Sequence, residues 1–168
     1  KKLKYTQKVD LDSPDVIFFV YLVGNIVYIG IDVTGSEHQK RHYKIFSHPA
    51  SLRGTIAYSL LRIAGYKPPQ FLLDPFAGSG IIPIEAALYA HKFPLHYYSK
   101  DKFSFLRLKP FSKIDSHKLF SSIDKKKAKP GKKTIKGSDS QLRCVTASMK
   151  NAKIAGIEKY ADFSRIDI

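Results

Sequence analysis

Two apolar runs rich in β-branched and aromatic residues stand near the start of the chain. They occupy residues 16–23 and 26–31 and are joined by Gly24-Asn25. A two-residue connection of this kind predicts an antiparallel β-hairpin. Because both runs are almost continuously apolar, we expect both faces of the hairpin to be covered, which requires more sheet than these residues supply.

Three later segments have the apolar spacing of helices. The first is predicted from Pro49 to Gly65. Proline is favoured in the first turn of a helix, and glycine is favoured at the position that follows the last helical residue. The second runs from Ser79 to about Ala90, and the third follows a cap at Ser140 and stops at Gly156. The predicted buried faces are Leu52, Ile56, Leu60 and Ile63 in the first helix, Ile82, Ala86 and Tyr89 in the second, and Leu142, Val145, Met149 and Ala152 in the third.

Short β-rich segments alternate with the last two helices. They cover residues 71–74, 134–139 and 161–166, and a carboxylate ends or directly follows each: Asp74, Asp139 and Asp167. Alternation of strands and helices predicts an α/β fold with a mostly parallel sheet. Because parallel strands end at the same edge, these carboxylates are candidates for one site.

The charge balance indicates a polyanionic partner. The chain has 29 Lys and Arg against 14 Asp and Glu, which gives a formal net charge of +15. Cations that neutralise phosphates release condensed counterions, so nucleic acid is the partner that such a surplus favours. A generally basic proteome is the alternative explanation of the same surplus.

The remaining composition narrows the class of protein. Cys144 is the only cysteine, which excludes an intramolecular disulfide and fits a reducing, cytoplasmic location. No stretch approaches the length of a membrane span, and Lys1-Lys2-Leu3-Lys4 lacks the apolar core of a signal peptide. The histidines show no metal-binding spacing, so we expect neither a membrane segment nor a metal site.

The segment Asp74-Pro75-Phe76-Ala77-Gly78-Ser79-Gly80 lies between a predicted strand and a predicted helix. Its glycines permit positive φ and close approach of a ligand, and the helix start offers backbone donors. A dinucleotide-binding loop would need a third glycine where Pro83 stands. The loop closely resembles the first motif of S-adenosylmethionine-dependent methyltransferases, and an ordinary strand-to-helix turn is the alternative.

Two of the strand-end carboxylates have expected roles in such a site. Asp139 ends the strand that follows the glycine-rich loop, where an acidic residue accepts hydrogen bonds from ribose hydroxyls. Asp167 follows the next strand and could meet the adenine amino group. For both residues, a plain strand-end turn is the alternative interpretation.

Residues 91–134 alternate cations with aromatic residues and end in a lysine-rich run. Lys102, Arg107 and Lys109 are the cations that we single out as RNA contacts, since this alternation suits phosphate contact with base stacking. In the alternative interpretation the aromatic side chains pack the segment onto the core, and the lysine run is a solvated loop.

Over most of its length the chain resembles the THUMP-domain RNA methyltransferases that modify guanine N2, with the tRNA-type members closest. In the first part of the chain, residues 27–35 resemble the closing strand of a THUMP domain, residues 40–44 its basic connector and residues 48–53 the start of the next helix. Residues 74–85 resemble the cofactor loop, and residues 137–139 with 151–156 resemble the second strand and helix of the methyltransferase fold. Residues 102–105 with Pro110-Phe111 resemble the insertion that this family has between them. The resemblance implies the end of a THUMP-like domain at 1–35, a linker at 36–47 and the first half of a Rossmann-like methyltransferase sheet at 48–168.

The resemblance also implies the partners and the residues that bind them. S-adenosylmethionine would be held by Asp74, Phe76, Gly78, Ser79, Gly80, Asp139 and Asp167. RNA, most directly tRNA, would meet Arg41 and Tyr43 of the connector as well as the cations of the insertion.

One family motif is missing from the chain. Family catalysis uses an Asn/Asp-Pro-Pro-Tyr segment, and the nearest match, Pro68-Pro69-Gln70, lacks the residues on both sides of the prolines. We therefore expect the remaining strands in the parent chain or another chain, and no activity from this chain alone. The alternatives are a methyltransferase acting on amino groups of DNA or ribosomal RNA, and a non-catalytic RNA-binding module derived from such an enzyme.

Overall fold

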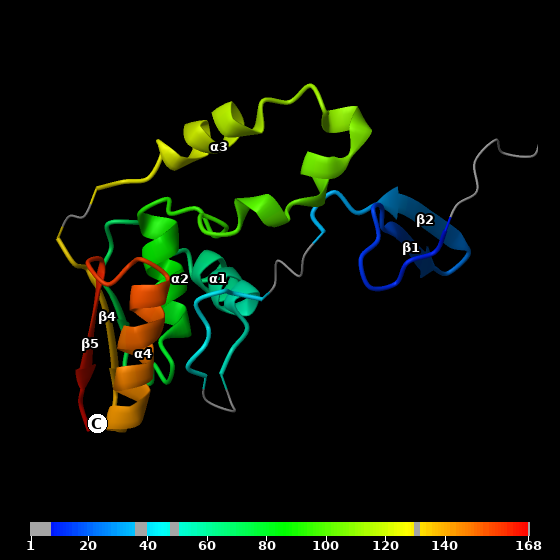
Figure 1. Cartoon of the computed structure of the whole chain (residues 1–168). Helices are drawn as coiled ribbons and strands as arrows, with labels where there is room; N and C mark the ends of the chain where they lie inside the picture. Colours follow the sequence, from blue (N-terminus) through cyan, green and yellow to red (C-terminus); the bar gives the residue numbers. More distant parts are fainter. Residues whose placement is uncertain (1–7, 36–39, 48–50, 130–131, 168) are drawn as a thin grey trace, which may run out of the picture. The chain divides into compact units, whose positions relative to one another are not determined.

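The computed structural model describes residues 8–35, 40–47, 51–129 and 132–167 (Figure 1). These residues form two compact units that do not follow chain order. One unit takes the described parts of residues 1–36 and 98–119, and the other takes those of 37–97 and 120–168.

The smaller unit contains the predicted hairpin. β1 (Phe18–Val23) pairs antiparallel with β2 (Ile26–Ile31), and Val23 lies opposite Ile26 across the turn. Gly24 has φ +57°, which explains why a glycine stands in this turn. The hairpin prediction is confirmed. Both strands are exposed along their whole length, so the described residues do not cover its faces as we expected.

Part of the segment at 91–134 packs onto the end of this hairpin. Three short 3₁₀ helices, η1 (Lys100–Lys102), η2 (Ser104–Arg107) and η3 (Lys109–Phe111), precede α3 (Ser116–Asp124). The Phe105 amide donates to the Val33 carbonyl at 2.9 Å, and the Phe105 ring contacts those of Phe103 and Phe111. These aromatic side chains pack among themselves, and none of the three belongs to the buried core cluster of the protein.

The larger unit contains a parallel three-stranded sheet. Its strands are β3 (Leu72–Asp74), β4 (Ile135–Asp139) and β5 (Ala161–Arg165), in the order β3-β4-β5. Asp74 lies opposite Gly137, and Asp139 lies opposite Arg165. The predicted α/β class with parallel strands is confirmed, and the strands end at a common edge.

Three helices lie on one side of this sheet (Figure 1). α2 (Ile81–Ala90) and α4 (Leu142–Ile154) cover the sheet, and α1 (Gly54–Ile63) packs on α2. Ile84, Ile135 and Ile157 are fully buried between the layers. On the opposite face of the sheet, Leu73 and Lys136 are exposed. Among the described residues, no helix is both long enough and apolar enough to span a membrane.

The predicted buried face of α1 is wrong, and that of α4 is correct only at Val145 and Ala152. α1 starts at Gly54, with Pro49 outside the described residues, and it buries Gly54, Ala57 and Leu61. Of the stripe that we expected, Leu52, Ile56, Leu60 and Ile63 are all exposed, Ile63 by 83%. The small residues Gly54 and Ala57 are buried where α1 packs on α2, and the apolar stripe points outward instead.

α4 departs from its prediction for a different reason. It begins after Gln141 rather than Ser140, and it leaves Leu142 and Met149 exposed while burying Ser148 and Asn151. The buried polar side chains of α4 form hydrogen bonds with backbone groups of neighbouring segments. The spacing of apolar residues cannot predict a helix face of this kind. In α2, by contrast, nearly every side chain is buried or half-buried.

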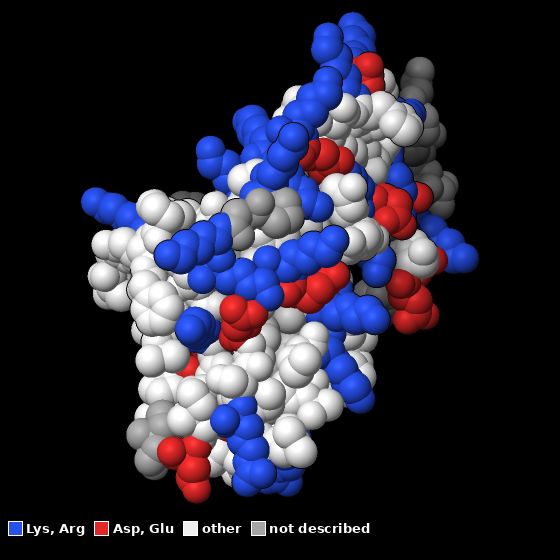
Figure 2. Space-filling view, turned by 90° about the vertical axis from the view of Figure 1, so that its left-hand side faces the viewer, with Lys and Arg blue, Asp and Glu red and all other residues white. Residues whose placement is uncertain are grey.

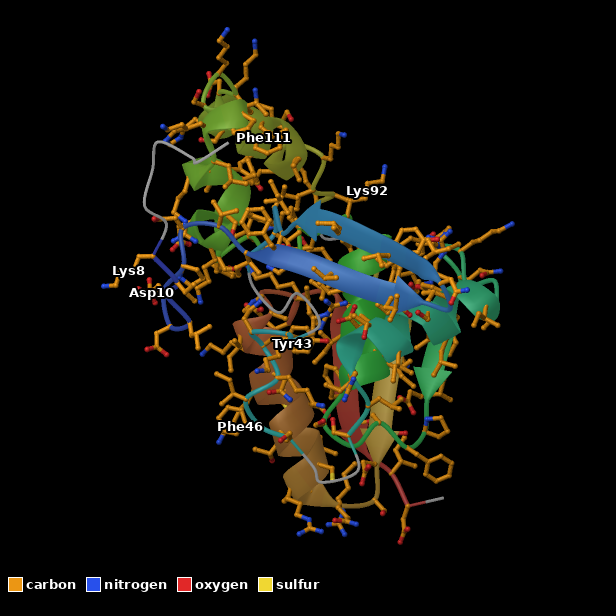
Figure 3. All side chains as sticks on the ribbon, turned by 90° about the vertical axis from the view of Figure 1, so that its right-hand side faces the viewer. Lys8, Asp10, Tyr43, Phe46, Lys92 and Phe111 are labelled. Carbon is orange, nitrogen blue, oxygen red and sulfur yellow. The ribbon has the colours of Figure 1, made fainter. Side chains whose placement is uncertain are left out.

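The connector at residues 40–47 is fixed to α2 by a buried carboxylate. Glu85 is 1% exposed and accepts hydrogen bonds from Arg41 Nε at 2.6 Å, Arg41 Nη2 at 3.2 Å and Tyr43 Oη at 2.6 Å. Tyr43, labelled in Figure 3, is completely buried, and the Arg41 side chain is 7% exposed. Burial and the Glu85 carboxylate raise the pKa of Tyr43, so its hydroxyl stays a donor. The connector is thus part of the fold.

Gly54 makes room for this cluster. A Cβ atom built on Gly54 would lie 2.5 Å from Arg41 Cγ and 2.7 Å from Glu85 Oε1. Those distances are too short for any side chain, so the first residue of α1 has to be glycine for the ion pair to form against it.

We expect Glu85→Gln to destabilise the fold by about 3–5 kcal/mol, because it removes the charge that compensates a buried guanidinium. Glu158→Gln serves as the matched control, since Glu158 is exposed in the same unit. Its effect should stay within about 0.5 kcal/mol. Urea unfolding followed by circular dichroism measures both variants, and equal midpoints would contradict a stabilising role for the cluster.

Candidate functional site

The loop from Asp74 to Gly80 joins β3 to α2 and is held in shape by hydrogen bonds within the loop and to β4. Asp74 Oδ1 accepts from the Phe76 amide at 3.1 Å, which turns the chain out of the strand. The Ala77 amide donates to the Ser138 carbonyl at 2.8 Å, and the Gly80 amide donates to the Ala77 carbonyl at 2.7 Å. The loop therefore stays close to the end of β4.

The two glycines of this loop have different roles. Both adopt positive φ, +54° at Gly78 and +82° at Gly80. A Cβ atom on Gly78 would meet no atom within 4 Å, so this position faces open space. A Cβ atom on Gly80 would lie 2.9 Å from Ser148 Cβ and 3.1 Å from the Phe163 ring. Gly80 therefore permits packing inside the protein, and Gly78 leaves space for a ligand.

Two polar residues of α4 hold the loop from behind. Ser148 Oγ donates to the Gly78 carbonyl at 2.9 Å, and Asn151 Nδ2 donates to the Ser79 carbonyl at 3.0 Å. Asn151 also binds the connector, because its amide group donates to the Phe46 carbonyl at 2.8 Å and accepts from the Phe46 amide at 3.1 Å. Phe46 lies beside α4 in Figure 3. One buried side chain thus joins the connector to the loop.

Asp139 closes the loop on its other side. Its Oδ2 accepts from the Gly78 amide at 3.0 Å, and its Oδ1 accepts from the Gln141 amide at 2.9 Å. An ionised carboxylate offers about four acceptor positions. These two bonds orient the carboxylate and leave each oxygen able to accept another hydrogen bond.

A cavity of about 280 Å³ opens between these elements. It contains five of the seven residues predicted to bind a cofactor: Asp74, Phe76, Gly78, Ser79 and Asp139. Its other lining residues are Ser51, Leu52, Ala77, Ile81, Ile82, Gln141 and Cys144. Gly80 and Asp167 do not line it, and Asp167 is exposed beyond the end of β5. The structure therefore brings most of the predicted set together but not all of it.

The cavity is rich in acceptors. Burial raises the pKa of Asp74, and the nearby Asp139 raises it further, against the opposing effect of the hydrogen bond from the Phe76 amide. Burial also raises the pKa of the Cys144 thiol, which disfavours a reactive thiolate. Two carboxylates at one end of the cavity suit a ligand that carries hydroxyl groups and positive charge.

Sequence reasoning missed the residues that support this site. They are Ser51, whose Oγ lies 2.9 Å from Ser79 Oγ, together with Glu85, Ser148 and Asn151. A signal existed for Glu85, since it is the only charged residue of α2. A single carboxylate in an otherwise apolar helix indicates a buried group with a partner.

The predicted RNA contacts fall into two groups. Arg41 and Tyr43 bind Glu85 inside the larger unit, so their side chains are not offered to an external phosphate in this structure. Lys102, Arg107 and Lys109 are exposed and belong to the smaller unit. Figure 2 shows that Lys and Arg outnumber Asp and Glu on the face that it displays, as the net charge of +15 leads us to expect.

Comparison with known proteins places this geometry among methyltransferases. Residues 41–168 match the family described as RMKL-like, methyltransferase domain. A tRNA (guanine(6)-N2)-methyltransferase of Methanocaldococcus jannaschii is 37% identical, over 93% of this chain and 40% of its own length. A ribosomal RNA large subunit methyltransferase K/L of Vibrio parahaemolyticus is 30% identical, over 94% of this chain and 22% of its own length.

Solved structures show the same fold. SMU.472, determined in complex with SAH, superposes with a TM-score of 0.76 at 22% identity, over 92% of this chain and 40% of that one. The chain thus spans less than half the length of each of these proteins.

We expect Gly80→Ala to be more damaging to stability than Gly78→Ala. A side chain in the left-handed conformation costs about 1–2 kcal/mol at either position. At Gly80 the collision with Ser148 and Phe163 should add about 1–3 kcal/mol. Chemical denaturation of both variants measures the difference, and equal losses would mean that Gly80 is not packed as described.

Proposed function

Because the chain belongs to the family of RMKL-like methyltransferase domains, we propose that it forms the cofactor-binding part of an S-adenosylmethionine-dependent enzyme that methylates guanine N2 in RNA, with tRNA as the substrate. The proposal depends most on the loop from Asp74 to Gly80. In this loop Gly78 faces the cavity, and its amide donates a hydrogen bond to Asp139.

The residues of the cavity fit S-adenosylmethionine. Asp139 retains acceptor positions for a pair of ribose hydroxyls, as an acidic residue does at this place in related folds. Gly78 leaves space where any side chain would project into the cavity, and Phe76, 78% exposed, offers an aromatic surface at its rim. Asp74 adds a carboxylate that suits the positive charge of the ligand. When bound, S-adenosylmethionine supplies an electrophilic methyl group.

Support for an RNA substrate comes from two sources. The relative from M. jannaschii is named a tRNA (guanine(6)-N2)-methyltransferase, and the relative from V. parahaemolyticus is named a ribosomal RNA methyltransferase. The net charge of +15 favours the same class of polyanion. We prefer tRNA because the identity to the tRNA enzyme is higher, and we place the activity in the cytoplasm.

The residues of this chain have binding roles in the proposal. Lys102, Arg107 and Lys109 stay assigned to RNA contact, since all three are exposed. Arg41 and Tyr43 are reassigned to fixing the connector through Glu85. We assign no catalytic residue, because the printed sequence contains no Asn-Pro-Pro-Tyr or Asp-Pro-Pro-Tyr segment.

Isothermal titration calorimetry of the full-length protein with S-adenosylmethionine tests the cofactor assignment. We expect Asp139→Ala to weaken binding by about ten- to a hundredfold, since hydrogen bonds to a charged group are lost. Asp167→Ala is the matched control and should leave the affinity unchanged, because Asp167 does not line the cavity. If Asp139→Ala bound as tightly as the wild-type protein, the assignment would be wrong.

A further inference from the structure

A second cavity of the larger unit is lined almost entirely by cationic residues. Its volume is about 340 Å³, and its lining residues are Lys40, Arg41, Lys44, Arg53 and Gly54. We propose that this cavity, called the connector cavity below, binds a backbone phosphate of the RNA substrate. The proposal rests on the proposed function, because it takes RNA to be the substrate.

The charges of the lining residues favour an anion. Glu85 compensates the charge of Arg41, but it is not itself a lining residue. Lys44 Nζ donates to the carbonyls of Ser51 at 3.2 Å and Leu52 at 2.8 Å, which are neutral acceptors and leave its charge uncompensated. Among the lining residues that the structure describes, none is a carboxylate. The charges of Lys44 and Arg53 therefore create a positive potential that a phosphate would relieve.

The backbone adds donors to this cationic lining. Gly54 is the first residue of α1, a helix of 10 residues, and the N-cap residue Arg53 makes no capping hydrogen bond through its side chain. The first turn of α1 carries no acidic residue. Amides of a first helical turn lack partners within the helix and favour anions. Here they strengthen a site that the side chains already define.

The position of the connector cavity explains why its ligand would be RNA. Ser51 and Leu52, whose carbonyls Lys44 binds, line the cavity assigned to S-adenosylmethionine. Arg53 and Gly54, the next two residues, line the connector cavity, so consecutive residues of one segment line the two cavities. A phosphate of the RNA backbone held in the connector cavity would keep the nucleotide near the methyl donor. Positioning of this kind can supply a large part of a rate enhancement.

The test compares two double variants with equal changes of charge. Lys40→Ser/Arg53→Ser removes two exposed cations of the connector cavity, and Lys153→Ser/Lys159→Ser removes two exposed lysines elsewhere in the same unit. Fluorescence anisotropy gives the affinity of the full-length protein for tRNA over a series of salt concentrations. Losing one phosphate contact should reduce the slope of log affinity against log salt by about 0.7–0.9. The control variant should keep the wild-type slope.

Each outcome of this experiment is decisive. If both double variants had the same salt slope, the proposed phosphate site would be wrong. Binding of tRNA by the wild-type protein would still support the proposed function. If the wild-type protein did not bind tRNA, both the proposed function and this site would fail. Titration with S-adenosylmethionine should give wild-type affinity in both double variants, and a double variant that fails this check is replaced by its single substitutions.

A separate arm distinguishes RNA from a free anion. Inorganic phosphate is titrated into the ¹⁵N-labelled full-length protein, and the amide signal of Gly54 is followed by nuclear magnetic resonance. The contrary result is that phosphate shifts this signal in the wild-type protein and not in Lys40→Ser/Arg53→Ser, while the same double variant keeps the wild-type salt slope for tRNA. These two observations together would show a site for free anions and would overturn the assignment to RNA. A reduced slope for tRNA supports it.

Discussion

The larger unit depends on one buried carboxylate. Glu85 lies in the middle of α2, the helix that follows the cofactor loop, and it receives hydrogen bonds from both Arg41 and Tyr43. A buried carboxylate without cationic partners would be strongly unfavourable, so its position requires the connector to pack against α2. Gly54 lets α1 approach the same point. Connector, α1 and α2 therefore meet at a single charge cluster.

The site depends on this arrangement through α4. Asn151 binds Phe46 of the connector and Ser79 of the cofactor loop, so the connector must be in place for the side chain to satisfy both partners. The loop is then closed on its other side by Asp139. The cavity lined by Gly78 and Asp139 and the connector cavity consequently lie next to elements of one hydrogen-bonded assembly. In the function that we propose, this assembly aligns a methyl donor with a polymeric substrate.

The sequence predicted the strands, the hairpin and the cofactor loop because each depends on neighbouring residues. Alternating or continuous apolar runs, the Gly24-Asn25 turn and the glycines at 78 and 80 are local signals. Helix faces were harder, since α1 packs through Gly54 and Ala57 and α4 through Ser148 and Asn151. The roles of Arg41 and Tyr43 could not be read locally, because their partner Glu85 lies 44 and 42 residues away in the sequence.

The central claim is that this assembly serves guanine-N2 methylation of RNA. The most direct test incubates the full-length protein with S-adenosylmethionine carrying a labelled methyl group and with unmodified tRNA, ribosomal RNA fragments or DNA in separate reactions. Nucleosides from each digest are then separated by chromatography. We predict label in N2-methylguanosine from tRNA. Label confined to DNA, or no transfer to any RNA by a protein that binds S-adenosylmethionine, would contradict the account.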